Sequence, residues 1–173
     1  MISRRVFIKT LITAAVCYPF KSVFAYHNKD RVLNMYNIHT DERLSEVYSS
    51  SGICDQDAID RINYFLRCHY TDEIVPIDIQ VIDLLCDIKD ICGRNREITI
   101  ISGYRSREYN NLLRSQGHNV SKNSLHIEGR AIDFTIEGIS NRKLARIAKT
   151  FKEGGVGKYS EFVHIDDGDV RYW

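Results

Sequence analysis

The sequence predicts an α+β fold in which helices pack against a small antiparallel sheet. Several segments carry apolar residues at helical spacing, and alternating or β-branched runs between them indicate strands. The order of these segments along the chain favours an antiparallel sheet. The chain has 173 residues, of which 43% are hydrophobic and 27% charged, so a single compact domain is expected.

The first half of the chain is expected to supply strands and a pair of core helices. Residues 26–53 are polar and irregular and predict one or two strands with turns. Asp55 caps a predicted helix that runs to about Cys68, and Asp78 begins a second helix that Gly93 ends. Both helices carry their apolar residues along one side, so they should pack together in the core.

The second half alternates between strands and helices. A run of β-branched residues predicts the first strand, and alternating apolar residues predict two others. Serines stand where the two helices should begin. The expected strands are 97–101, 129–136, 156–159 and 162–166, and the expected helices run from Ser106 to 117 and from Ser140 to 154, with a polar loop at 117–125.

The first 25 residues differ from the remainder in charge and are predicted to be an export signal. They hold four of the 24 Lys and Arg residues and no acidic residue. A basic start precedes an apolar run at 11–20 and small residues at Val23 and Ala25, which is the layout of a secretory signal. The run is shorter than the roughly 20 residues needed to span a bilayer.

The stretch 3–9, with Arg4 and Arg5, resembles the twin-arginine export signal. We therefore expect cleavage after Ala25, a periplasmic domain at 26–173 and no membrane span after cleavage. An uncleaved membrane anchor is the alternative. The net charge of +1 and the lack of a basic cluster disfavour a nucleic-acid partner, and a monomer is expected.

Four cysteines lie after residue 25, and their state is open from sequence. An even number in an exported protein permits two disulfides, with three connectivities. Buried, unpaired thiols are the alternative. No Cys-x-x-Cys pair occurs, which disfavours a zinc–thiolate site and a redox function. The four are Cys54, Cys68, Cys86 and Cys92.

Three residues are candidate metal ligands: His126, Asp133 and His164. Asp133 lies inside an apolar strand, where an aspartate is costly unless it is paired or binds a cation. His164 is likewise embedded in an apolar strand. Two imidazoles and one carboxylate suit a catalytic zinc site, because three protein ligands leave a fourth position for water. On spacing alone, core histidines and an aspartate paired with an arginine remain open.

Further motifs surround these residues and carry a family resemblance. The set resembles the zinc peptidoglycan peptidases of the superfamily that contains lysostaphin, the D-Ala-D-Ala metallopeptidases and sonic hedgehog. It is most similar to the bacterial murein endopeptidase branch, and the resemblance covers most of residues 30–173. The motifs are Ser102-Gly103-Tyr104-Arg105-Ser106, Ser124-x-His126-x-x-Gly129-x-Ala131-x-Asp133, Gly154-Gly155-Val156-Gly157, Phe162-Val163-His164-Ile165-Asp166-x-Gly168 and Arg171-x-Trp173.

The resemblance implies a hedgehog-like or D,D-peptidase-like fold and one Zn²⁺ per chain, held by His126, Asp133 and His164. Arg105 corresponds to an arginine that holds the substrate or polarises its carbonyl, a role suited to a permanently charged bidentate donor. A salt bridge at the start of the following helix is the alternative for Arg105.

The general base has two candidates. Glu161 lies three residues before the last zinc histidine, where several relatives carry an acid, but the segment before it is shorter than this branch leads us to expect. Asp166 shares a strand face with His164 and could act as the base or orient that ligand. We favour Glu161, because the base must reach the activated water.

Four further residues are assigned to the substrate site as alternatives to structural roles. Tyr104 and Trp173 could line the groove or pack in the core. His118 could stabilise the reaction intermediate or be an exposed loop histidine. Ser124 is expected to support the loop before His126.

The resemblance implies hydrolysis of peptide cross-links between peptidoglycan stem peptides during wall remodelling. A carboxypeptidase or dipeptidase acting on the same stem peptides is one alternative. A non-catalytic wall-binding domain that keeps the metal site is another. The sequence does not distinguish D-Ala–diaminopimelate from diaminopimelate–diaminopimelate links.

Overall fold

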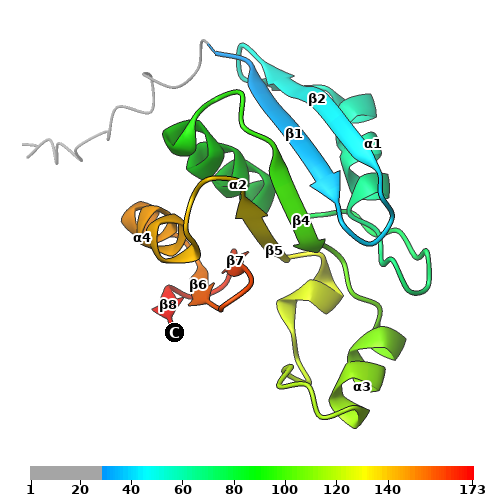
Figure 1. The fold of residues 1–173 in the computed structure, drawn as a ribbon. Coiled ribbons are helices and arrows are strands. Elements are labelled where there is room, and N and C mark those ends of the chain that lie inside the picture. Colours follow the sequence, from blue (N-terminus) through cyan, green and yellow to red (C-terminus); the bar gives the residue numbers. More distant parts are fainter. Residues whose placement is uncertain (1–28) are drawn as a thin grey trace, which may run out of the picture.

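Eight strands form one sheet in the order β3-β2-β1-β4-β5-β7-β6-β8. The structure is a computed structural model that describes residues 29–173 (Figure 1). The strands are β1 (Arg31–Asn37), β2 (Arg43–Ser50), β3 (Ile53–Cys54), β4 (Ile98–Ser102), β5 (Ala131–Ile136), β6 (Gly155–Lys158), β7 (Val163–Asp166) and β8 (Arg171–Tyr172). The helices are α1 (Gln56–Phe65), α2 (Ile79–Cys92), α3 (Arg107–Ser115), α4 (Asn141–Phe151) and the 3₁₀ helix η2 (Leu125–Glu128).

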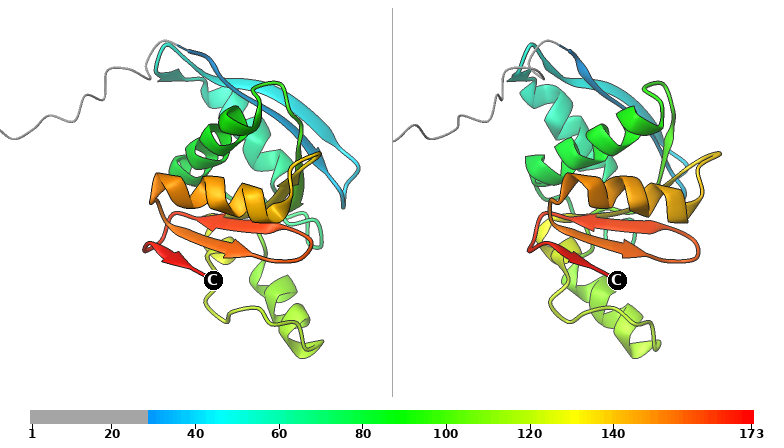
Figure 2. Two further views of the ribbon diagram at one scale, coloured as in Figure 1. Left: turned by 60° about the vertical axis from the view of Figure 1, so that its left-hand side comes forward. Right: turned by 90° about the vertical axis from the view of Figure 1, so that its left-hand side faces the viewer.

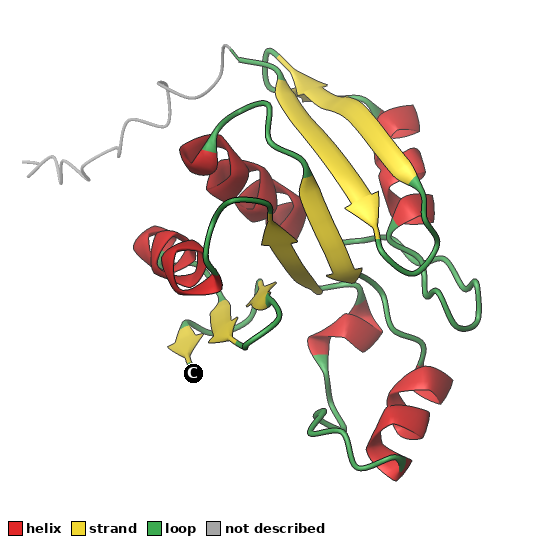
Figure 3. Cartoon of the chain, viewed as in Figure 1, coloured by secondary structure: helices red, strands yellow, loops and turns green. Residues whose placement is uncertain are grey.

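The α+β prediction is confirmed. Helix α1 packs beside β2, and α4 packs over β6 and contacts α2, which also contacts β1 and β5. Helix α3 and the loop after it extend away from this body (Figures 2 and 3). The sheet is larger than expected, and it is antiparallel except at two places, where β1 pairs with β4 and β6 pairs with β8 in parallel.

The predicted helix starts are confirmed by side-chain caps. The Asp55 carboxylate accepts hydrogen bonds from the first-turn amides of α1, and Asp78 accepts one from Gln80 N in α2. Ser106 and Ser140 cap α3 and α4 in the same way. These side chains pair amides that have no partner within the helix, which is why they fix where each helix begins.

Three short elements were not expected: η2, β8 and β3, which is a third strand where one or two were predicted. The start of η2 falls within the expected loop 117–125, where Ile127 N donates to Ser124 O at 3.0 Å. Gly129 ends this turn with a φ of 69°, and a Cβ there would lie 2.5 Å from Pro76 O. Strand β8 follows the last expected strand, and its pairing with β6 continues as Trp173 N donates to Val156 O at 3.2 Å. A two-residue strand has no periodicity that a sequence could reveal.

The predicted signal, residues 1–25, lies outside the described residues. Across residues 29–173, no helix is long and apolar enough to cross a membrane. The four cysteines in this part of the chain are unpaired, with Cys68 and Cys86 buried in the core and Cys54 exposed.

The loop after α1 carries a histidine that is held neutral. The ring of His69 stacks on that of His39, with centroids 3.8 Å apart, and meets Tyr109 edge-on at 4.8 Å. Burial, assisted by the nearby His39 and Arg105, lowers the pKa of His69 from 6.5 to about 4. The unfolded chain therefore takes up a proton at this residue at a higher pH than the folded chain does.

This difference predicts a pH-dependent contribution to stability. It is fully present above the unfolded pKa of 6.5 and is lost as the pH falls toward about 4. We expect His69→Asn to reduce the fall in the free energy of unfolding between about pH 7.5 and about pH 5. Urea denaturation of the wild type and the variant at each pH measures the free energy of unfolding. Other titrating groups are the same in both proteins, so their contributions cancel in the comparison. An unchanged pH dependence in the variant would contradict the prediction.

Candidate metal centre

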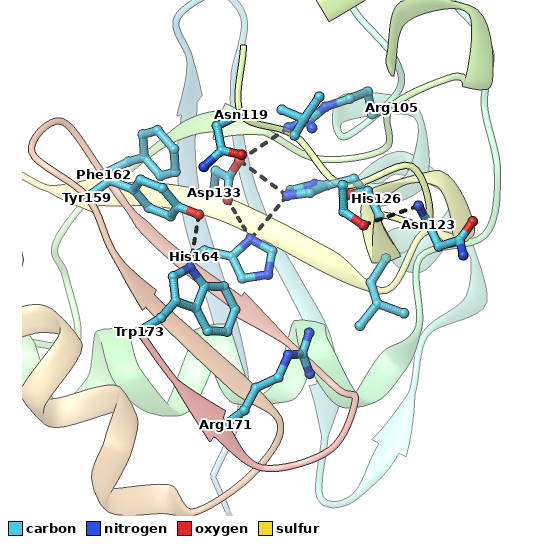
Figure 4. Close-up of a pocket in the computed structure, with 14 residues that line it drawn as sticks. Arg105, Asn119, Asn123, His126, Asp133, Tyr159, Phe162, His164, Arg171 and Trp173 are labelled. Carbon is cyan, nitrogen blue, oxygen red and sulfur yellow. Dashed lines mark hydrogen bonds and ion pairs between the residues drawn. The ribbon is translucent and has the colours of Figure 1, made fainter. Parts of the chain in front are cut away.

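The three predicted ligands come from separate elements and converge. His126 is the second residue of η2, Asp133 lies in β5, and His164 lies in β7 directly opposite Asp133. Asp133 Oδ1 lies 2.8 Å from His164 Nδ1, and Asp133 Oδ2 lies 3.2 Å from His126 Nε2. One donor atom from each residue falls within 4.8 Å of the others (Figure 4). The pairing of β5 with β7 thus places Asp133 opposite His164, and the turn of η2 brings His126 to them.

The remaining ring nitrogens orient the imidazoles. His126 Nδ1 lies 2.7 Å from Gly103 O, and His164 Nε2 lies 2.9 Å from Asp166 Oδ2. A carbonyl and a carboxylate can only accept, so these nitrogens donate. A neutral His126 then presents Nε2 as an acceptor, and a neutral His164 presents Nδ1. Two acceptor nitrogens and one carboxylate, each fixed from behind, fit the ligand set of a catalytic zinc ion.

Charges in the triad are strongly coupled. Burial opposes the charge on Asp133, but His126 and His164 hold the pKa of that carboxyl below its usual value. Burial also disfavours a charged His164, yet hydrogen bonds with Asp133 and Asp166 raise its pKa to about 9. Burial lowers the pKa of His126. When His164 loses its proton at Nδ1, the triad carries the negative charge of Asp133, and a metal cation can take the place of the proton.

Glycine at position 103 allows the chain to approach the site. A Cβ there would lie 2.5 Å from Leu66 O, which only glycine avoids. The carbonyl of Gly103 can consequently reach His126, and the next residues bring Arg105 to the triad. Gly103 stands in one of the family motifs but had no predicted role of its own, because it contributes a backbone oxygen.

Arg105 is almost completely buried beside the triad. Its Nη2 lies 3.4 Å from Asp133 Oδ2 and 3.3 Å from Ser102 Oγ, and its backbone N donates to His126 O at 3.1 Å. The Nε atom is buried and has no hydrogen-bond partner among the described residues. Arg105 nevertheless lines the cavity beside Asp133, which is the place that its predicted role would need.

A cavity of about 480 Å³ opens in front of the triad. One wall is the loop from Asn119 to Leu125, which presents amide and hydroxyl side chains, including the predicted Ser124. Another wall is aromatic and consists of Tyr159, Phe162 and Trp173. Arg105 and Arg171 complete the lining (Figure 4).

The aromatic wall depends on a glycine in β6. The Trp173 ring lies 5.4 Å from that of His164, and its Nε1 donates to Tyr159 Oη at 2.9 Å. A Cβ at Gly157 would lie 2.6 to 2.8 Å from atoms of the indole. Gly157 thus leaves the space that the Trp173 indole occupies beside β6.

We expect Gly157→Ala to displace the indole from the cavity wall. Trp173 is the single tryptophan of the chain, so fluorescence reports on it alone. The variant should show greater quenching by acrylamide and a red-shifted emission, because the ring becomes more exposed to water. Tyr159→Phe, which removes only the hydrogen bond to Nε1, should give a smaller change. Unchanged quenching in Gly157→Ala would show that the indole is not held by this contact.

Asp166 and Glu161 differ sharply in their surroundings. Asp166 is fully buried, and its carboxylate accepts from His164, Arg171 and the backbone amides of Gly155 and Gly168. Glu161 is exposed, and its Oε2 accepts from Ser160 Oγ at 2.7 Å.

Four of the predicted functional residues do not line the cavity: Asp166, Glu161, Tyr104 and His118. Glu161 stands in the turn between the lining residues Tyr159 and Phe162. Tyr104 belongs to the hydrophobic core, and its hydroxyl donates to Glu73 Oε2 at 3.1 Å. His118 is an exposed residue of the loop after α3.

The cavity is also lined by residues that had no predicted role. Asn119, Asn123, Tyr159 and Arg171 line it. The motif Arg171-x-Trp173 was a usable signal for Arg171, since it closes the ordered set of motifs. The asparagines stand in an irregular polar loop, and no spacing rule distinguishes them from other loop residues.

Comparison with known proteins gives one consistent result. Residues 25–173 match a family model described as peptidoglycan L,D-endopeptidase MepK. The chain is 37% identical over 148 residues to the peptidoglycan L,D-endopeptidase MepK of Escherichia coli K12, covering 84% of this chain and 81% of that protein. It is 38% identical to a probable peptidoglycan L,D-endopeptidase MepK of Haemophilus influenzae, over 84% of this chain and 80% of the relative.

Proposed function

The chain belongs to the peptidoglycan L,D-endopeptidase MepK family, and we propose that it is a zinc-dependent endopeptidase that hydrolyses peptide cross-links in peptidoglycan. The observation that carries the zinc assignment is the convergence of His126, Asp133 and His164 at an open cavity. Each histidine is oriented by an acceptor on its far side, as catalytic zinc sites require.

The names of the relatives also favour one of the two cross-links. An L,D-endopeptidase cuts between a carbonyl on an L-centre and an amine on a D-centre. The diaminopimelate–diaminopimelate link has this configuration, whereas the D-Ala–diaminopimelate link joins two D-centres. We therefore assign the diaminopimelate–diaminopimelate link as the substrate.

The residues of the cavity divide the chemistry between them. The chemistry supplied by bound zinc is Lewis acidity, which lowers the pKa of water and polarises the scissile carbonyl. Arg105 lines the cavity beside Asp133, and its guanidinium can donate to the carbonyl oxygen as that oxygen gains negative charge. Ser124 stands in the loop wall that encloses the peptide.

The proton transfer is assigned to Glu161. Among the lining residues the sole carboxylate is Asp133, which is already committed to the triad. Glu161 lies in the turn between the lining residues Tyr159 and Phe162, and we propose that its side chain turns from Ser160 into the cavity when the substrate binds. In that position it would take a proton from the attacking water and return it to the leaving amine.

Cleavage of defined muropeptide dimers tests the function. The purified zinc-loaded protein is incubated with dimers of each linkage, and the products are identified by mass spectrometry. We expect diaminopimelate–diaminopimelate dimers to become monomers faster than D-Ala–diaminopimelate dimers. Release of terminal D-Ala alone would instead support the carboxypeptidase alternative. Binding to the wall without any cleavage would support a non-catalytic domain.

We also propose that residues 1–25 direct export to the periplasm by the twin-arginine route. The family match begins at residue 25, where the predicted signal ends. An enzyme that acts on the wall must reach it, and the twin-arginine route carries folded proteins. N-terminal sequencing of the protein recovered from the periplasm should begin at Tyr26, and Arg4→Lys with Arg5→Lys should retain the protein in the cytoplasm.

A further inference from the structure

We propose that Arg171 is a specificity-determining residue that binds the free carboxylate next to the scissile nitrogen of the substrate. The inference rests on the proposed function, because it assigns a role within the same cavity. In a diaminopimelate–diaminopimelate link, the D-centre that carries the scissile nitrogen also carries a free carboxylate. A guanidinium group recognises such a carboxylate through paired N–H donors.

The guanidinium of Arg171 is held in a fixed position at the cavity wall. Its Nη2 lies 2.8 Å from Asp166 Oδ2, and its Nη1 lies 3.2 Å from Asp166 Oδ1. Nη1 also donates to Asp169 O at 3.0 Å. These bonds use three of the five N–H donors, and the side chain is 44% exposed. A fixed, half-exposed guanidinium loses little conformational entropy when it binds an anion.

Two glycines enclose the same group. A Cβ at Gly155 would lie 3.0 Å from Arg171 Cζ, and a Cβ at Gly168 would lie 2.9 Å from Arg171 Nη1. The guanidinium also lies over the Trp173 ring, 5.3 Å from its centroid. The two glycines, the Asp166 carboxylate and the Trp173 indole together fix the orientation of the guanidinium.

The charges of the cavity suit an anionic substrate. Its lining includes two arginines, and Asp133 is the one acidic residue among the described residues that line it. Arg105 contacts Asp133, whereas Arg171 contacts the residue behind His164. The two guanidiniums consequently stand on opposite sides of the triad (Figure 4).

This arrangement gives each side of the scissile bond one guanidinium. With Arg105 at the carbonyl oxygen, the leaving amine and its neighbouring carboxylate extend toward Arg171. A substrate whose carboxylate is converted to an amide lacks the partner for Arg171 and should react more slowly.

Kinetics with three matched dimers test the inference. One dimer has both diaminopimelate carboxylates free, one has an amide on the amine side of the scissile bond, and one has an amide on the carbonyl side. We expect the wild type to cleave the amine-side amide about tenfold less efficiently in kcat/KM than the free acid. Arg171→Gln should cleave the free acid with a kcat/KM about tenfold lower than that of the wild type, mainly because KM rises. Its kcat/KM for the amine-side amide should equal that of the wild type.

Arg171→Lys should restore part of the preference, because it keeps the charge. Arg130→Gln is the matched control, since Arg130 pairs with Asp167 and Glu128 and does not line the cavity. It should retain the full preference. Equal losses on the free acid and the amine-side amide would overturn the inference, because Arg171 would then act only by supporting Asp166. A preference that follows the carbonyl-side carboxylate would overturn it as well.

A binding measurement separates this inference from the proposed function. A dimer with a ketomethylene group in place of the scissile amide cannot be hydrolysed, and its affinity is measured by calorimetry with and without the amine-side amide. We expect the wild type to bind the free acid about tenfold more tightly and Arg171→Gln to bind both forms equally. The affinities decide the role of Arg171 even if no dimer is cleaved, which would count against the proposed function alone. Equal wild-type affinity for both forms would overturn the inference.

Discussion

Replacing His126 with alanine is expected to remove bound zinc and to lower endopeptidase activity about a thousandfold, equivalent to about 4 kcal/mol of transition-state stabilisation. His126 supplies one of three donor atoms that lie within 4.8 Å of one another, and within residues 29–173 the cluster has no fourth His, Cys, Asp or Glu to replace it. With two ligands left, the site binds zinc weakly, and the activation of water and carbonyl is lost together with the metal. Zinc content by plasma mass spectrometry and cleavage of muropeptide dimers measure the two effects.

His118→Ala is the matched control for this variant. His118 is an exposed histidine in the loop after α3, outside the cavity lining, so zinc and activity should both be retained. Activity lost with full zinc in this control would instead support the role in stabilising the intermediate that the sequence suggested. A His126→Ala protein with stoichiometric zinc and full activity would refute the metal centre.

Local elements were predictable because their signals are local. The caps Asp55, Asp78, Ser106 and Ser140 each act on amides two or three residues away, so the sequence places them without knowledge of the fold. Pairing partners are different, because they depend on chain segments far apart. The parallel pairing of β1 with β4 joins residues about 60 positions apart, and no short pattern encodes it.

In the candidate site, too, some features follow from local sequence and others depend on segments that are far apart in the chain. His126, Asp133 and His164 were identified because a specific motif surrounds them, and the β5–β7 register then places Asp133 opposite His164. The group that accepts from His126 Nδ1 is the backbone oxygen of Gly103. Every residue has a backbone oxygen, so the sequence does not indicate which one lies next to His126, and only the fold shows it. Arg171 reaches the cavity through a two-residue strand that pairs with β6, which sequence periodicity does not reveal.

Asp166→Asn is expected to weaken zinc binding about 10- to 100-fold, which is the usual cost of losing the partner that orients a metal ligand. Asp166 fixes the ring of His164 by accepting from Nε2 at 2.9 Å, and this bond leaves Nδ1 facing the triad. Asparagine has the same shape but no charge, so the hold on both His164 and Arg171 weakens. A zinc titration against a competing chelator measures the affinity.

The alternative role of Asp166 as general base conflicts with its surroundings. Burial works against its charge, yet hydrogen bonds from His164 and from the backbone amides of Gly168 and Gly155 lower its pKa to about 2. A carboxylate with so low a pKa is a weak base near neutral pH. Its oxygens also accept from Arg171, so protonation would break existing hydrogen bonds.

The two candidates can therefore be separated by saturating the variants with zinc. Asp166→Asn should regain most of its activity when zinc is in excess, because its defect is in holding the metal. Glu161→Gln should bind zinc as the wild type does and still lose about 100-fold or more in kcat, the contribution of a positioned base. If zinc restores nothing to Asp166→Asn and Glu161→Gln remains fully active, the proton transfer belongs to Asp166, and the hydrogen bonds that surround it must open during turnover.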